Sequence, residues 1–436
     1  MIYGLISCYM LDKIKPGLVR ILRWSESYAH TDMVYLVKNG GWLMFSRIVG
    51  MAFAFGLSLA FANLLPPEVY GTYRYVISVA NILMLFTLSN MSTAVIRAIA
   101  QGRDGVVKSA VKAEINWGLL GAVCSFALAA YYFYSGNRVL ASAFLVVTFF
   151  VPFLNVYSIY NSILYGKKLF ELSVRYDVLT QVVNLGLILP LLLTTREVWI
   201  LILPFLFVNS GLQKIWLWRT ERKVALNDVG DSETVKYGKQ LSFLGILNSF
   251  SVMIDQVVVF NLLGPIQLAV YNMALAPAEQ IKSIIKIIGF LAFPKFADQP
   301  FERLKRSLVG KTLKLALMVF LIVTVYVVLA PWLYSILFPA YSASVWQTRL
   351  LAVSLIFGVS NLQLTALQAH GRVKALYWWN ISSAIVQIAL VILGAAFFGI
   401  LGVILSRVLA RFYDLVCLTF LTARAKPETK QAVSND

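Results

Sequence analysis

Long apolar runs recur along almost the whole of this 436-residue chain. A helix needs about 20 apolar residues to cross the hydrocarbon core of a bilayer, and these runs reach that length. They do not alternate in polarity, as membrane β-strands of about 10 residues would. Only helices and closed barrels satisfy every backbone polar group in lipid, so an all-α polytopic membrane protein is predicted. Its twelve expected helices are 42–62, 75–95, 115–134, 139–163, 177–194, 198–218, 240–261, 268–291, 313–336, 346–368, 375–397 and 401–421.

The composition excludes an ordinary soluble protein. Hydrophobic residues make up 59% of the chain and charged residues only 13%. Soluble domains carry about 25% charged residues, so these charges are too few to cover a water-exposed surface of this size. Three cysteines lie far apart and only two histidines are present. The sequence therefore predicts neither a disulfide framework nor a metal site, and no cofactor is expected.

The basic residues follow the predicted loops. The chain has 38 Lys and Arg against 20 Asp and Glu, which gives a net charge of +18. Most of them lie in the N-terminal segment, in the loops after even-numbered helices and in the C-terminal tail, whereas the opposite side holds only Arg74, Arg138, Arg196 and Arg349. Basic loops stay in the cytoplasm, so both termini are expected there. This asymmetry explains the net charge without nucleic acid as a partner.

The first 40 residues precede the predicted spans. Met1–Leu11 is apolar but lacks a basic start and a small-residue cleavage site, so it is a poor signal peptide. Lys13–Trp24 is a short basic amphipathic segment, and such segments bind anionic membrane surfaces. Two interpretations stay open: an interfacial helix, or an upstream extension without a role.

An internal repeat divides the chain into two halves. Residues 63–73 and 261–271 share five of eleven positions at an offset of 198, and 164–167 resemble 369–372 at an offset of 205. Each half then holds six helices, so the halves run parallel about an axis along the membrane normal. The predicted division is an N-terminal segment 1–40, a six-helix bundle 41–218, a linker 219–238, a second six-helix bundle 239–424 and a tail 425–436, with a central cavity between the bundles.

Short motifs follow one another in a fixed order: PPEVYGTY (66–73), SNMSTAVIRAIA (89–100), MIDQVVVFNLLG (253–264), YNMA (271–274), FPKFA (293–297), LQAHGRVKA (367–375) and FGILGVILSR (398–407). Together they resemble the polysaccharide biosynthesis proteins of the multidrug/oligosaccharidyl-lipid/polysaccharide exporter superfamily, over roughly residues 38–425. No single motif is strong, and the resemblance rests on their order and spacing. Pro66 stands where the family's outer motif usually has Gly.

The resemblance implies a flippase, not an enzyme. Such a protein moves an undecaprenyl-diphosphate-linked oligosaccharide, the repeat unit of an O-antigen, capsule or exopolysaccharide, from the inner to the outer leaflet. Its partners would be this lipid-linked oligosaccharide and the membrane lipids of a bacterial or archaeal inner membrane. We expect a monomer that works by alternating access, with the substrate between the two bundles.

A diphosphate head group needs cations inside the membrane, because a buried charge must be paired. Arginine suits a diphosphate since its planar guanidinium donates hydrogen bonds in pairs. The candidate cavity residues are Arg47 in the first span, Arg97 at the inner end of the second, Lys282 and Lys286 in the eighth, and Arg407 in the twelfth. The alternatives are head-group anchors for the first two, an early helix end for the lysines, and a local ion pair of Arg407 or Arg411 with Asp414.

Two acidic residues are candidates for coupling or gating. Asp255 lies in the apolar stretch VMIDQVVVF of the seventh span. A lone buried carboxylate either pairs with a cation such as Arg47, which would hold the two halves in one state, or takes up H⁺ or Na⁺ as a coupling ion. Glu279 shares a helix face with Lys282 and Lys286, at spacings of three and seven residues.

Other functions stay open. A cation-coupled drug exporter of the same superfamily would favour an acidic cavity, whereas these candidates are mostly basic. A membrane-embedded polymerase or glycosyltransferase would be expected to show a long outer loop or a D-x-D-like acidic pair, and the sequence shows neither. Lys305 stands where a phosphate-binding loop ending in Gly310-Lys311-Thr312 would need Gly, so ATP drive is not predicted.

Overall fold

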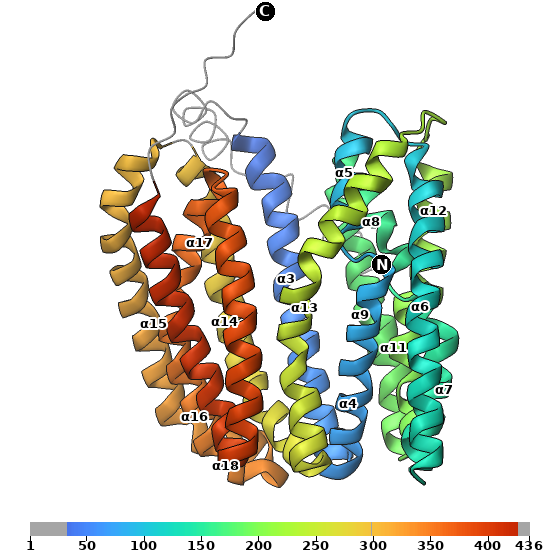
Figure 1. Cartoon of the computed structure of the whole chain (residues 1–436), viewed down its shortest axis with the longest axis vertical. Coiled ribbons are helices and arrows are strands. Elements are labelled where there is room, and N and C mark those ends of the chain that lie inside the picture. The colour runs from blue at the N-terminus through green and yellow to red at the C-terminus, as the bar shows by residue number, and fades with distance from the viewer. Residues whose placement is uncertain (1–32, 298, 426–436) are drawn as a thin grey trace, which may run out of the picture.

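The computed structural model describes residues 33–297 and 299–425. Within these residues the chain forms helices joined by short turns, and it contains no strand. The helices run roughly side by side between two ends of the molecule (Figure 1). The amphipathic segment Lys13–Trp24 and the end of the C-terminal tail lie outside the described residues.

From Met33 onward, the described part of the first half forms ten α-helical elements. They are α3 (Met33–Leu64), α4 (Pro67–Leu83), α5 (Met91–Ala100), α6 (Val106–Tyr134), α7 (Arg138–Phe150), α8 (Ile159–Gly166), α9 (Phe170–Thr194), α10 (Val198–Leu201), α11 (Leu203–Phe207) and α12 (Gln213–Lys223). Short 3₁₀ segments extend α4 and join α7 to α8, and a π-helical turn joins α11 to α12; they are η1 (Met84–Thr87), η2 (Val151–Phe153), η3 (Val156–Ser158) and η4 (Val208–Leu212).

The second half contains fewer and longer helices. They are α13 (Ser232–Leu263), α14 (Pro265–Ala297), α15 (Phe301–Leu337), α16 (Val345–Val353), α17 (Asn361–Ala369) and α18 (Val373–Arg424), with the 3₁₀ segments η5 (Pro339–Ser344) and η6 (Ser354–Ser360) before and after α16. The 52-residue α18 is two helices, because Gly399 has φ 57° and ψ −140°. Ser406 Oγ donates to the carbonyl of Leu390 at 2.5 Å, so the chain reverses at Gly399 and the two parts pack antiparallel.

Ten helical stretches of the described chain are long and apolar enough to cross a membrane. With α18 counted as two helices and α14 added, the order matches the twelve predicted spans. The all-α polytopic fold is therefore confirmed. Helix ends were less predictable: the second span begins at Pro67 rather than at 75, since proline fits the first helical position. The loop between α12 and α13 is only 224–231, shorter than the predicted linker, because both helices continue into polar sequence.

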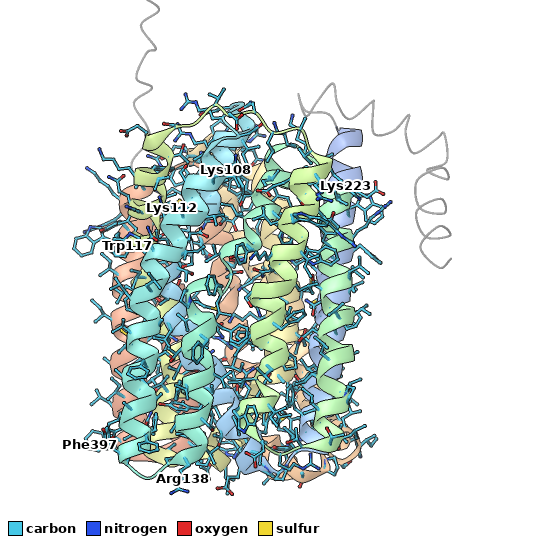
Figure 2. The ribbon with its side chains drawn as sticks, turned by 90° about the vertical axis from the view of Figure 1, so that its right-hand side faces the viewer. Lys108, Lys112, Trp117, Arg138, Lys223 and Phe397 are labelled. Atoms are coloured by element: carbon cyan, nitrogen blue, oxygen red, sulfur yellow. The ribbon has the colours of Figure 1, made fainter. Side chains whose placement is uncertain are left out.

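The two ends of the molecule differ in charge. Lys108, Lys112 and Lys223 lie at one end, which we call the basic end, whereas Arg138 and Phe397 lie at the opposite end, the far end (Figure 2). The short turns between α3 and α4 and between α13 and α14 also lie at the far end (Figure 1). The loops after the even-numbered spans therefore lie together at the basic end, as the charge pattern predicts.

Ion pairs join the loops at the basic end. Lys167 Nζ lies 2.7 Å from Asp104 Oδ2, and Arg103 Nη1 lies 2.6 Å from Asp231 Oδ2. Asp231 also caps α13 by accepting a hydrogen bond from the backbone N–H of Glu233 at 3.0 Å. The pKa of Asp231 is lowered mainly by the Arg103 guanidinium and, to a smaller extent, by the hydrogen bond from the Thr234 hydroxyl. The carboxylate therefore stays charged at neutral pH, which suits a helix N-terminus.

The two halves meet along α13, which belongs to the second half by sequence. Near the basic end α13 packs on α5 of the first half, where Asn90 Nδ2 donates to the carbonyl of Leu241 at 3.1 Å. Farther along it packs on α18, and Gln387 Nε2 donates to the carbonyl of Ser251 at 2.8 Å. Thus α13 crosses from one half to the other between the two ends (Figure 1). The arrangement as two parallel six-helix bundles stays a prediction.

Candidate functional site

Charged residues on α14 lie inside a continuous helix. The alternative that this helix ends near Pro277 is wrong, since α14 runs from Pro265 to Ala297. Lys282 Nζ donates to both carboxylate oxygens of Glu279, at 2.8 and 2.9 Å. Lys286 is exposed one turn farther along the same helix. The predicted charged face of α14 therefore exists.

Pro277 is accommodated by a hydrogen bond from a neighbouring helix. Proline has no N–H, so the carbonyl four residues earlier, that of Met273, loses its helical partner. The buried hydroxyl of Tyr334 in α15 donates to this carbonyl at 2.8 Å. The same compensation occurs at Pro331, where Arg349 Nε donates to the carbonyl of Val327 at 2.9 Å. Both helices remain continuous because the freed carbonyls are satisfied.

Tyr334→Phe is expected to lower the free energy of unfolding by about 1–3 kcal/mol, the cost of a buried unsatisfied polar group. Thermal unfolding in detergent measures this loss. In a Pro277→Ala background the loss should be smaller, because the new N–H bonds the Met273 carbonyl within the helix. Equal losses in both backgrounds would contradict the assignment.

Asp255 lies at the centre of a buried polar cluster. Its side chain is fully buried in α13, and Oδ2 accepts hydrogen bonds from the hydroxyl of Tyr271 and from Arg407 Nε, the latter at 2.8 Å. Arg407 Nη2 also pairs with the same oxygen. Of the two open alternatives, pairing with a cation is the arrangement found, but the cation is Arg407 and not Arg47. Arg407 belongs to the same half as Asp255, so this pair does not join the two halves.

Glu279 connects this pair to a second arginine. Arg407 Nη1 lies 3.7 Å and Arg411 Nη2 lies 3.6 Å from Glu279 Oε1. Arg411 also donates through Nη1 to Ser354 Oγ and, at 3.3 Å, to the carbonyl of Leu351. The alternative of a local ion pair between Arg411 and Asp414 is not the arrangement found. The Asp414 carboxylate instead accepts a hydrogen bond from the indole N–H of Trp379 in α18 at 2.9 Å.

We call Asp255, Tyr271, Glu279, Lys282, Arg407 and Arg411 the α13–α14–α18 cluster. It contains three cations and two carboxylates, an arrangement that is costly in a membrane unless it faces a pathway or a partner. Of the sequence candidates it brings together four: Lys282, Arg407, Asp255 and Glu279. Tyr271 was missed, although it is the repeat equivalent of Tyr73. Arg411 was weighed beside Arg407 but was not selected as a candidate cavity residue.

Three candidate cavity residues lie outside this cluster: Lys286, farther along α14, and the two residues Arg47 and Arg97. Arg47 is an exposed residue of α3, and its neighbour Ser46 donates to Asp177 Oδ2 in α9 at 3.4 Å. Arg97 is exposed near the end of α5, and its guanidinium lies 5.6 Å from the ring centre of Tyr237. Their roles as cavity residues stay predictions.

A polar network joins the two halves beside the cluster. Arg74 of α4 donates through Nε to Asn272 Oδ1 at 3.0 Å and through Nη2 to Gln256 Oε1 at 3.3 Å. The Ser78 hydroxyl donates to the same Gln256 oxygen at 2.7 Å. Gln256 and Asn272 are buried. Arg74 is thus not a loop residue, as the charge pattern suggested, but an interior contact between the halves.

Close packing continues this contact toward the far end. The rings of Tyr75 and Phe260 stack with centres 3.9 Å apart. Gly71 approaches the backbone of Pro265 so closely that a Cβ atom at this position would lie 1.8 Å from the Pro265 carbonyl oxygen. The far end is therefore closed between α4 on one side and α13 and α14 on the other.

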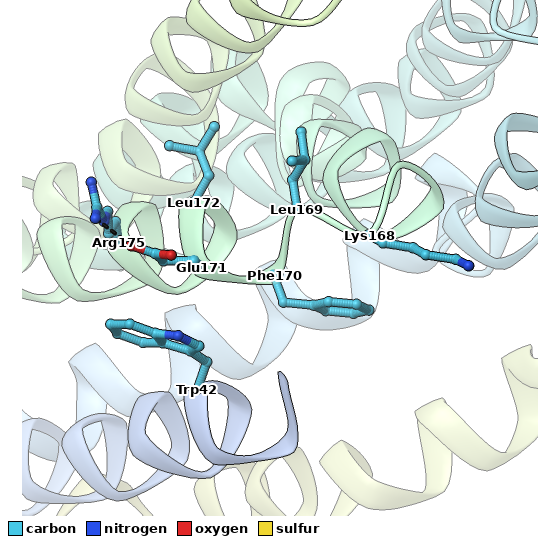
Figure 3. Close-up of a pocket in the computed structure, with 7 residues that line it drawn as sticks. All are labelled: Trp42, Lys168, Leu169, Phe170, Glu171, Leu172 and Arg175. Carbon is cyan, nitrogen blue, oxygen red and sulfur yellow. Dashed lines mark hydrogen bonds and ion pairs between the residues drawn. The ribbon is translucent and has the colours of Figure 1, made fainter. Parts of the chain in front are cut away.

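A separate surface pocket lies near the start of α9. It has a volume of about 300 Å³, and Trp42 of α3 and Phe170 of α9 are among the residues that line it (Figure 3). Glu171 and Arg175 form an ion pair on its wall. None of the residues of the α13–α14–α18 cluster lines this pocket.

Known proteins share both sequence and fold with this chain. A family model described as polysaccharide biosynthesis protein matches residues 36–299. A Shigella flexneri protein described as "Putative O-antigen transporter" is 24% identical over 419 residues, which cover 89% of this chain and 98% of that protein.

Solved transporter structures share the fold, among them the following two. The lipid II flippase MurJ in an inward closed conformation is similar with a TM-score of 0.62 and 14% identity, covering 88% of this chain and 87% of that one. An inward-facing multidrug resistance transporter of the MATE family and MOP superfamily gives a TM-score of 0.59 at 15% identity, covering 86% and 94%.

Proposed function

Because this chain belongs to the polysaccharide biosynthesis protein family, we propose that it is a flippase for an undecaprenyl-diphosphate-linked oligosaccharide repeat unit. It would carry this lipid from the inner to the outer leaflet by alternating access. The relative named as an O-antigen transporter and the fold shared with a lipid II flippase both support a lipid-linked glycan as cargo.

The observation that carries the proposal is the surplus of cations in the α13–α14–α18 cluster. Within the described chain Lys282, Arg407 and Arg411 form ion pairs with Asp255 and Glu279, and Asp414 lies near Arg411 and Lys282. Lys286 adds a further positive charge on the same face of α14. A diphosphate is an anion with many acceptor oxygens, and guanidinium groups bind such oxygens in pairs. The cluster therefore favours an anionic head group over a cationic cargo.

Alternating access is supported by the contact between the halves. Arg74 and Asn272 occupy equivalent positions of the repeat, at the offset of 198, and they touch each other. Residues related by a two-fold axis meet only close to that axis, so it passes near this contact. We infer parallel halves with the basic end and both termini in the cytoplasm of a bacterial or archaeal cell. Coupling to H⁺ or Na⁺ through Asp255 or Glu279 is part of the proposal.

A cation-coupled drug exporter is the alternative that the shared MATE fold allows. Such a protein would need acidic groups left over for a positively charged drug, whereas both carboxylates of this cluster are already paired with cations. A polymerase or glycosyltransferase fits less well, because the far-end connections of the described chain are short.

Transport in proteoliposomes tests the proposal. A fluorescent undecaprenyl-diphosphate oligosaccharide should equilibrate between leaflets, as shown by its accessibility to a membrane-impermeant glycosidase. Lys282→Gln should slow this by roughly ten- to a hundredfold, since a charge-assisted hydrogen bond is worth about 1.5–3 kcal/mol.

Lys112→Gln, at the exposed basic end of α6, is the matched control and should transport normally. Absence of lipid movement by the unchanged protein, together with uptake of a cationic dye, would instead support the drug exporter.

A further inference from the structure

Glu279 holds a position that suits a larger anion. Three cations from two helices point at its carboxylate: Lys282 Nζ at 2.8 Å, Arg411 Nη2 at 3.6 Å and Arg407 Nη1 at 3.7 Å, all to Oε1. Only the first distance is that of a hydrogen bond. The carboxylate is thus fixed by its neighbour on α14 and is too far from both arginines to bond to them.

Each of the two arginines has one Nη group that lies near Glu279 and is not used on another acceptor of the described chain. Arg407 uses Nε and Nη2 on Asp255, which leaves Nη1 facing Glu279. Arg411 uses Nη1 on Ser354 and Leu351, whereas its Nη2 is buried and makes no hydrogen bond within the described residues. A buried donor without an acceptor costs about 1–3 kcal/mol, and an anion with more oxygens than a carboxylate would recover this.

The two carboxylates differ in how easily they could leave. Asp255 is fully buried and accepts three hydrogen bonds from Tyr271 and Arg407, so it is held in place. The Glu279 side chain is 39% exposed, whereas those of Arg407 and Arg411 are only 11% and 13% exposed. Glu279 therefore lies at the open side of the site, on a flexible side chain that can turn outward.

We propose that Glu279 occupies a phosphate site built by Lys282, Arg407 and Arg411, and that a phosphate of the substrate enters by displacing it. This rests on the proposed function in taking a prenyl diphosphate as the ligand. In the empty protein the Glu279 carboxylate neutralises part of the positive charge of these three cations, which would otherwise be costly in the membrane. On binding, the anion takes over both free arginine donors while Asp255 keeps Arg407 in position.

Binding of prenyl diphosphate to the full-length protein in detergent tests this inference. Glu279→Gln keeps the size of the side chain but removes the competing charge, so affinity for inorganic pyrophosphate and geranyl diphosphate should rise by roughly tenfold. Adding Arg411→Gln to this variant should abolish the gain. If Glu279→Gln does not fold, Glu279→Ala tests the same charge removal.

A matched control separates displacement from a general change in field. Glu171→Gln makes the same change at a carboxylate of α9 that pairs with Arg175 outside the cluster, and it should leave affinity unchanged. An equal gain in this control, or no gain in Glu279→Gln, would overturn the proposal. Equal tightening for phosphatidylglycerol would also overturn it, since the site would then serve a membrane phosphodiester.

The binding assay involves no transport, so its outcome is independent of the flippase test. If the unchanged protein translocates lipid-linked oligosaccharide but Glu279→Gln gains no affinity, only the displacement inference fails. If pyrophosphate binding behaves as expected but no lipid moves, the site stands and the flippase proposal fails.

Discussion

Asp255→Asn is expected to abolish transport and to lower the stability of the folded protein. The substitution leaves the Arg407 guanidinium buried without its carboxylate. Removing one partner of a buried ion pair costs about 3–5 kcal/mol, which far exceeds the effect of an exposed substitution. Thermal unfolding in detergent measures the stability loss, and the leaflet assay measures transport in protein that has inserted normally.

The matched control is Asp228→Asn, in the loop before α13, where the side chain is fully exposed. Asp228→Asn should change neither the stability in thermal unfolding nor the rate of transport. Full transport by inserted Asp255→Asn protein would refute a functional role for this pair.

Replacing both members of the pair separates stability from function. Asp255→Leu combined with Arg407→Met removes the unpaired charge, and apolar replacement of a buried ion pair is often neutral or stabilising. Stability should therefore recover relative to Asp255→Asn while transport remains lost. Recovery of transport in the double variant would show that the pair only supports the fold.

Gly71→Ala is expected to force apart the contact that closes the far end. The added Cβ would lie 1.8 Å from the Pro265 carbonyl oxygen, and a backbone atom cannot turn away as a side chain would. Either α4 or α14 must move, which also disturbs the nearby bonds of Arg74 to Asn272 and Gln256. A cysteine at buried Ser78, in a background without the native cysteines, should react faster with a membrane-impermeant maleimide.

Gly56→Ala in α3 is the control, because a Cβ there meets nothing within 4 Å. At such an open helical position alanine should stabilise by roughly 0.5–1 kcal/mol. In thermal unfolding, Gly71→Ala should lower the stability of the protein and Gly56→Ala should raise it. Unchanged stability and unchanged Ser78→Cys labelling in Gly71→Ala would show that the close approach does not hold the far end shut.

Much of the fold follows from the sequence, because lipid leaves few choices to an apolar run. Span number, order and the shared end of the basic loops could all be predicted from hydropathy and charge. Helix ends could not, as α4 begins eight residues before its predicted start. Polar residues continue a helix once its apolar part is fixed in the membrane, so hydropathy alone underestimates helix length.

The candidate site was only partly predictable. A lone acidic residue in an apolar run must have a partner in the membrane, so Asp255 could be identified from the sequence. The identity of its partner could not. Arg47 and Arg407 are equally unusual in sequence, and only packing of α13 against the second part of α18 selects Arg407. Arg74 was overlooked because its position near a predicted helix end resembled an ordinary loop arginine.

Asp255 and Gln256 are neighbours on one rigid rod, and this has a mechanical consequence. One faces Arg407 in the second half and the other faces Arg74 in the first half. At 1.5 Å per residue the 32 residues of α13 measure roughly 48 Å, and its basic end lies about 35 Å from Asp255. A tilt of about 10° pivoting at this pair would displace that end by roughly 6 Å. The helix thus acts as a lever arm: a small adjustment where an anion would bind is amplified where α13 rests on α5.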